Sequence, residues 1–218
     1  MRFTNRHVHI RFMALFIGIV TGFLSILLPC PQVIADKVRP LNLEQLVEGS
    51  GVIFEGKCTD VRTGKDPDTG MISTWITFKI TQGLKGKLGD EYVLKQFGGS
   101  DGTMNVKTPS VTYEVGETVV LFLYETSRIG FSSAVGLHQG KFAIKEITES
   151  KVRYATNGIP SMMLFENMRV SPPALNAKGM KAQGQEMLRS DKLELHAFLS
   201  EIKNIVQLQE KNKNLQEQ

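Results

Sequence analysis

The stretch TFKITQGLKGKLGDEYVLKQFGG, residues 77–99, contains two runs of alternating apolar and polar residues around a glycine-rich turn. The first run continues upstream, and its apolar face consists of Ile72, Ile76, Phe78 and Ile80. Because successive side chains of a strand point to opposite faces, this alternation predicts half-buried strands. The glycines between the runs predict a turn. The stretch therefore predicts two antiparallel strands that end at a Phe-Gly-Gly corner.

Other runs of the same kind flank this pair, at residues 51–61, 117–125 and 137–147. The run 117–125 is apolar on both faces, which is typical of a central strand that is covered on both sides. Glycine-rich turns join the runs, and no helical pattern between them is long enough for a parallel crossover. Residues 36–147 are therefore predicted to form a mainly β domain, a small antiparallel barrel or sandwich.

Two helices are predicted outside this barrel. Asn42 and Gln45 form a capping box for a short N-terminal helix, which would end in left-handed geometry near Gly49 and Gly51. At the other end, Asp191 and Glu194 predict the capping box of an amphipathic helix over 188–208. Residues 148–187 are predicted to be an irregular connector, in which MLFENM is a strand or an apolar anchor, and residues 209–218 a polar tail that frays.

Residues 1–35 are predicted to be an export signal. They contain three arginines and no acidic residue before the apolar run 12–28, and Val33 and Ala35 suit a signal peptidase, so the mature chain would begin at Asp36. The apolar run is only slightly shorter than the roughly 20 residues that cross a bilayer, so an uncleaved membrane anchor is the alternative. The sequence therefore predicts a secreted, periplasmic or cell-envelope protein, in contact with a membrane only through an uncleaved leader.

The charge of the chain argues against nucleic acid as a partner. The formal net charge is +4, from 26 basic and 22 acidic residues. Three of the basic residues lie in the leader, which leaves 23 against 22 in the mature chain. Nucleic-acid binding requires basic residues in local excess, and the mature chain has no such excess.

The sequence shows no arrangement of catalytic or metal-binding residues. The mature chain keeps one cysteine, Cys58, which shares a strand face with Val52 and Phe54 and is predicted to be buried. Its two histidines, His138 and His196, lack cysteine or histidine neighbours at ligand spacing, so neither a metal nor a cofactor is predicted. A thiol enzyme that uses Cys58 is a third hypothesis, and it requires an exposed thiol.

The loop FGGSDG, residues 97–102, is the most unusual segment of the predicted barrel. Two adjacent glycines allow a sharp bend or a close approach of the backbone to a ligand. The loop does not match a phosphate-binding loop, because no Gly-Lys-Ser or Gly-Lys-Thr sequence completes it. Loops that join barrel strands commonly carry recognition. The predicted partner contacts are Phe97, Gly98, Gly99, Ser100, Asp101 and Tyr113.

The segments VIFEGKCTDV, TFKITQGLKG, VLKQFGG and YEVGETVVLFL follow one another in this order. In strand order and in its Lys-Gly and Val-Gly-Glu turns, the region 43–144 resembles the OB-fold module of tissue inhibitors of metalloproteinases and netrins, a layout also found in bacterial secreted proteins. The resemblance implies that residues 36–147 form an OB-like barrel with a protein-binding role. In those inhibitors an N-terminal cysteine contacts the protease zinc, whereas Asp36 would be first here, and the family's disulfide cysteines are missing.

The leading hypothesis from sequence is therefore an exported, non-enzymatic module that binds another protein through its loops, with an extracellular protease as one candidate. A membrane-anchored envelope protein is the alternative, and a thiol-dependent enzyme is the third hypothesis.

Overall fold

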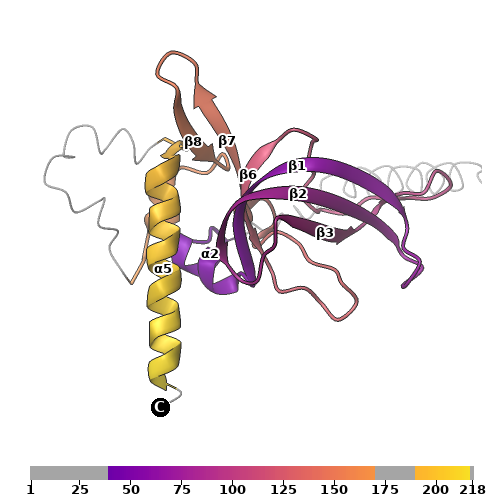
Figure 1. Cartoon of the computed structure of the whole chain (residues 1–218), viewed down its shortest axis with the longest axis horizontal. Helices are drawn as coiled ribbons and strands as arrows, with labels where there is room; N and C mark the ends of the chain where they lie inside the picture. The colour runs from indigo at the N-terminus through magenta and orange to yellow at the C-terminus, as the bar shows by residue number, and fades with distance from the viewer. Residues whose placement is uncertain (1–38, 170–189, 217–218) are drawn as a thin grey trace, which may run out of the picture. The chain divides into compact units, whose positions relative to one another are not determined.

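The computed structural model describes residues 39–169 and 190–216, and within them the chain is mainly β, as predicted (Figure 1). Seven strands form one antiparallel sheet in the order β3-β2-β1-β6-β7-β8-β9. In chain order these are β1 (Val52–Lys65), β2 (Ile72–Lys85), β3 (Glu91–Phe97), β6 (Thr118–Leu123), β7 (Lys141–Ile147), β8 (Val152–Thr156) and β9 (Leu193–Glu194). The strands β4 (Gly99–Ser100) and β5 (Asn105–Val106) form a separate small hairpin.

Strands β2 and β3 pair antiparallel, as predicted, and β1 pairs with β2 in a long, bulged hairpin. The register of the pair shifts at three places, one of them at Gly56. Such bulges bend a strand and increase its twist. A Cβ atom at Gly56 would lie 2.9 Å from the carbonyl oxygen of Lys79, so the two strands approach too closely there for a side chain. Strands β1, β2 and β3 curl together as a result (Figure 1).

The prediction of a closed barrel is wrong, because the named strands form an open sheet. Within the described residues, the segment after β6 makes two isolated bridges, from Phe131 to Lys95 of β3 and from Ala134 to Leu123 of β6. Serine side chains in this segment bond to nearby main chain: the amide of Phe131 donates to Ser127 Oγ, and Ser132 Oγ donates to the Tyr124 carbonyl. These local bonds compete with a regular ladder, which explains why no strand closes the sheet.

The sheet has a hydrophobic cluster on each face. The helix-side cluster lies between the sheet and the helices α2 (Leu43–Gly49) and α5 (Leu195–Gln216), where the rings of Phe142 and Phe198 lie 4.7 Å apart between centroids. The strand-side cluster fills the curl of the sheet around Phe54, Phe78 and Leu94. Strand β6 contributes side chains to both clusters, which confirms that it is central and covered.

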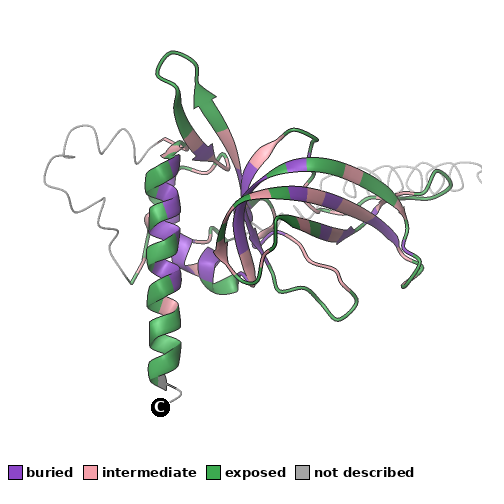
Figure 2. Cartoon of the chain, viewed as in Figure 1, coloured by how far each residue is buried: buried purple, intermediate pink, exposed green. Residues whose placement is uncertain are grey.

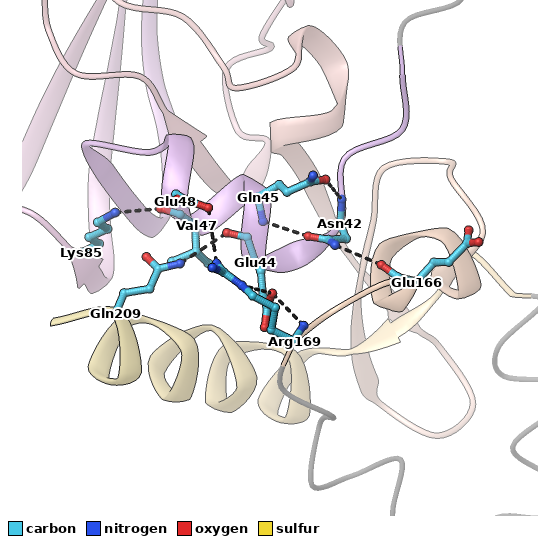
Figure 3. Close-up of polar contacts among 9 residues, drawn as sticks. All are labelled: Asn42, Glu44, Gln45, Val47, Glu48, Lys85, Glu166, Arg169 and Gln209. Carbon is cyan, nitrogen blue, oxygen red and sulfur yellow. Dashed lines mark hydrogen bonds and ion pairs between the residues drawn. The ribbon is translucent and has the colours of Figure 1, made fainter. Parts of the chain in front are cut away.

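The predicted N-terminal helix is present as α2, and its capping box is confirmed. The Asn42 side chain accepts from the Gln45 amide, and the Gln45 side chain accepts from the Asn42 amide. The predicted left-handed glycine end is wrong, because the chain leaves the helix at Ser50 in an extended conformation. The Val47 carbonyl in the last turn accepts from the Ser50 amide at 3.3 Å and from the Lys85 ammonium at 2.7 Å (Figure 3).

The C-terminal helix α5 begins and ends later than the predicted 188–208. Its first amides, those of His196 and Ala197, donate to the Glu194 carboxylate, so Glu194 caps the helix. The predicted box with Asp191 is wrong, because that carboxylate accepts from the Thr156 hydroxyl. The prediction of a frayed tail at 209–218 is also wrong, because α5 continues as far as Gln216. The glutamine, glutamate and lysine residues of this segment favour a helix. Figure 2 shows the buried residues of α5 along the side that faces α2.

The predicted irregular connector 148–187 contains regular elements. Strand β8 pairs with β7 through a turn in which Lys151 has a φ of 54°, and MLFENM overlaps the short helix α3 (Ser161–Phe165) instead of forming a strand. Residues 170–187 lie outside the described residues. The strand predicted from residue 137 starts at Lys141, because the 3-10 helix η1 (Leu137–Gly140) precedes it.

The predicted signal segment 1–35 and the mature start at Asp36 also lie outside the residues that the structure describes. Among the helices of residues 39–169 and 190–216, none is long and apolar enough to cross a membrane.

Candidate functional site

The corner after β3 is built around two glycines with positive φ, 100° at Gly98 and 125° at Gly99. A Cβ atom at Gly98 would lie 2.9 Å from the Val106 carbonyl oxygen, so only glycine allows the chain to pass here. The chain then forms the β4–β5 hairpin, in which β4 lies against β1 and β2. The unusual glycine pair thus positions this hairpin.

Polar residues of the loop stabilise the hairpin itself. The Asp101 carboxylate accepts from the amides of Met104, at 2.7 Å, and Thr103, at 2.9 Å. These two bonds lower the pKa of Asp101. The Ser100 carbonyl accepts from the Thr63 hydroxyl at 2.6 Å, which ties the hairpin to β1. Ser100 and Asp101, two predicted contacts, therefore have structural partners of their own.

A cavity of about 440 Å³ lies between this hairpin, the ends of β1 to β3 and the segment that leads to Tyr113. We call it the hairpin groove. The predicted residues Phe97, Gly98, Gly99 and Tyr113 all line it, whereas Ser100 and Asp101 do not. Its walls also include the apolar residues Val61, Ile76, Val106 and Val111. The structure thus brings four of the six predicted residues to one concave site.

Tyr113, a predicted partner contact, is not exposed. Its side chain is buried in the strand-side cluster, with its ring edge-on to Phe78 at 5.3 Å between centroids. The Lys141 ammonium lies 4.8 Å from the centroid of the same ring. Burial raises the pKa of Tyr113, so its hydroxyl stays protonated. Tyr113 forms the inner wall of the groove, because the irregular segment before it turns the ring inward.

Gln96 is a groove residue that is absent from the contacts predicted from sequence. It is 4% exposed, and its Nε2 has no hydrogen-bond partner among the described residues. The Tyr113 hydroxyl also has no hydrogen-bond partner among the described residues. A signal is present in the sequence, since Gln96 shares a strand face with the buried Leu94. A polar residue at an inward position is unusual unless it is paired.

The rim of the groove carries exposed apolar side chains. Phe97 lines the groove and is 46% exposed, and Met104 is 58% exposed at the tip of the hairpin. Aromatic residues and methionine are enriched at protein interfaces. The rim therefore offers apolar contact area next to the concave site.

Two other cavities have charged groups that are already paired. In a cavity of about 330 Å³ beside Trp75, Lys95 pairs with Asp66 at 2.8 Å. In a smaller one of about 140 Å³ beside α5, Arg169 Nε lies 3.3 Å from Glu44 Oε2 (Figure 3). Paired groups have less to offer a ligand, so the hairpin groove is the stronger candidate.

The buried thiol of Cys58 is the group that a thiol enzyme would require. Its Sγ lies 3.7 Å from the Asp60 carbonyl oxygen, and burial is the main cause that raises its pKa. The thiol is buried, as the strand pattern predicted, and its raised pKa keeps it protonated, whereas a nucleophilic cysteine is a thiolate. Within the part of the chain that the structure describes, no three His, Cys, Asp or Glu residues are grouped so that they could hold a metal.

No protein-family model matches the sequence, and a search of curated proteins finds no match. The role of the groove therefore rests on its own residues.

Proposed function

We propose that this chain is an exported, non-enzymatic module that binds another protein through the hairpin groove and its rim. The observation that carries this proposal is the combination in one place of a concave apolar site, two unpartnered polar groups and the exposed side chains of Phe97 and Met104. Interfaces are typically anchored by aromatic side chains next to pockets that exclude water.

The leader places the protein outside the cytoplasm in this proposal, as a secreted, periplasmic or cell-envelope component. The resemblance to the OB-fold module of metalloproteinase inhibitors makes an extracellular protease one candidate partner. A membrane-anchored envelope protein is the second candidate function, supported by the length of the apolar run 12–28. The hairpin groove would serve recognition in both cases.

Photo-cross-linking tests the proposal while the partner is still unidentified. A photoreactive phenylalanine analogue is placed at Phe97 or Met104 of the exported protein in its native host. The control position is Val152, which is 41% exposed on the β7–β8 hairpin and does not line the groove. We expect defined protein adducts from the two rim positions and none from Val152. Equal labelling from all three positions, or no protein adduct from the rim, would contradict the proposal.

A further inference from the structure

The main chain at the floor of the hairpin groove is already hydrogen-bonded within the protein. The Gly98 amide donates to the Ile72 carbonyl at 2.9 Å, and its carbonyl accepts from the Thr74 hydroxyl at 2.7 Å. The Phe97 carbonyl accepts from the Thr108 hydroxyl at 3.3 Å. These backbone groups have partners, so the polar recognition of a ligand falls to side chains.

The side chains with unmet hydrogen bonds are concentrated at this groove. Three buried side-chain polar atoms lack a partner among the described residues: Gln96 Nε2, the Tyr113 hydroxyl and Glu201 Oε1. Two of the three belong to residues that line the hairpin groove. Because native proteins pair nearly all buried polar groups, an unpaired donor and an unpaired hydroxyl in one site point to a partner that the isolated chain lacks.

We infer that the hairpin groove binds an extended peptide segment of the partner protein, an inference that rests on the proposed function. A peptide main chain offers both a carbonyl acceptor for Gln96 Nε2 and an amide donor or carbonyl for the Tyr113 hydroxyl. Its apolar side chains suit the walls formed by Val61, Val106 and Val111. Three hydroxyl groups of the lining, those of Thr63, Thr74 and Thr108, already donate to main-chain carbonyls and are not free to bind the hydroxyl groups of a polysaccharide.

Binding requires a small opening of the groove, since both unpartnered atoms are shielded from solvent. The wall that must move is the segment 107–113, which has no helix or strand. Two of its contacts are side-chain-to-backbone bonds, from Lys141 Nζ to the Thr112 carbonyl and from the Thr108 hydroxyl to the Phe97 carbonyl. New bonds from the ligand to Gln96 and Tyr113 offset the cost of this opening.

This inference predicts opposite effects on stability and on binding. Tyr113→Phe removes the unpartnered hydroxyl and keeps the ring, and Gln96→Leu replaces the unpartnered amide with an apolar group of similar size. Leaving a buried polar group unsatisfied costs free energy, so each variant should have a higher Tm than the natural chain. Each should also bind the peptide roughly tenfold more weakly, as expected for the loss of one hydrogen bond.

The probe is a phage-displayed library of random linear peptides, selected on the natural chain after depletion on Gln96→Leu. Enriched peptides are synthesised and titrated against both variants, with Tyr154→Phe as a matched control on β8. We expect the affinity to fall for Tyr113→Phe and Gln96→Leu and to stay unchanged for Tyr154→Phe. Thermal denaturation of the same proteins measures whether each groove variant has the higher Tm that we expect.

Several results would overturn the inference. Unchanged affinity in both groove variants would place the peptide elsewhere, and failure to enrich any sequence would remove the peptide as the ligand. Binding of a host envelope polysaccharide to the groove in place of peptides would have the same effect. If rim cross-linking still captures a protein while these tests fail, protein binding stands and only the peptide mode is lost. If rim cross-linking also fails, the proposed function is lost as well.

Discussion

Lys95 Nζ lies 2.8 Å from Asp66 Oδ2, and this ion pair ties the tip of the β1–β2 hairpin to strand β3. Both side chains are shielded, with 12% of Lys95 and 2% of Asp66 exposed. The same Asp66 oxygen accepts from the Thr69 hydroxyl at 2.6 Å, and the ammonium lies 4.6 Å from the centroid of the Phe131 ring. The pair therefore connects the hairpin, the edge of the sheet and the segment after β6.

Asp66→Asn should lower the Tm at neutral pH by several degrees, because Lys95 loses its charged partner. The hydrogen bond from Lys95 lowers the pKa of Asp66 most, followed by the Thr69 bond, and the charge of Lys95 contributes least. A lowered folded-state pKa stabilises the protein above the ordinary carboxyl pKa of about 3.9, and the stabilisation disappears as the pH falls through the folded value. The difference in Tm between the natural chain and Asp66→Asn should therefore shrink below about pH 4.

Thermal denaturation of both proteins between neutral and acidic pH measures this dependence. The matched control is Asp68→Asn, since Asp68 lies in the same turn and is exposed. A pH-independent difference for Asp66→Asn, or an equal effect of Asp68→Asn, would show that the ion pair is not its source.

The Cys58 thiol should resist alkylation in the folded protein. It is fully buried, and its raised pKa keeps it protonated, so both access and reactivity are low. Mass spectrometry after iodoacetamide treatment should find an unmodified Cys58 in buffer and a modified one in urea. Rapid labelling under native conditions would revive the thiol-enzyme hypothesis.

The strands β1 to β3 can be predicted from sequence, whereas the open edge of the sheet cannot. Alternation places Ile76 and Phe78 on one face, and both are buried. The same rule assigns Ser73 to the wet face, although it is fully buried, because the end of β3 and the β4–β5 hairpin pack around that end of β2. The segment after β6 forms no regular strand against β3, and the local bond of its Phe131 amide to Ser127 Oγ is not revealed by any periodic pattern.

The candidate site can be predicted only in part, for a related reason. The glycines after Phe97 mark the corner in sequence, since few other residues accept its backbone angles. The inward turn of Tyr113 follows from an irregular segment without periodicity, so its burial is a property of the fold alone. Gln96 is missed because an alternating pattern draws attention to apolar neighbours such as Leu94 and not to the polar residue that shares their face.

Glu194→Ala should destabilise helix α5 by about 1 kcal/mol, the usual contribution of an N-terminal cap. Its carboxylate accepts from the amides of His196 and Ala197, and the variant leaves both without a side-chain partner. Asp191→Ala is the matched comparison, because it removes a bond to Thr156 and leaves the cap intact. Urea denaturation measures stability, and circular dichroism measures helix content. Loss of helix in Asp191→Ala and not in Glu194→Ala would restore the capping box predicted from sequence.

The exported protein should begin at Asp36. Val33 and Ala35 suit a signal peptidase, and cleavage there removes the arginines and the apolar run together. Mass spectrometry of the N-terminal peptide, isolated from the culture medium and from the membrane fraction, tests this. An intact leader in the membrane fraction would favour the anchored envelope protein over the secreted module.

Gly98→Ala should destabilise the protein by more than the roughly 1–2 kcal/mol typical of a non-glycine residue in left-handed geometry. Its φ is 100°, and its Cβ atom would also meet the Val106 carbonyl oxygen at 2.9 Å. Gly102→Ala separates the two effects, because Gly102 has a φ of 87° with no atom within 4 Å of the added Cβ. Urea denaturation should rank the variants with Gly98→Ala the less stable. Equal losses of stability would mean that the β4–β5 hairpin moves away from Gly98 at low cost. The groove would then be flexible and not preformed.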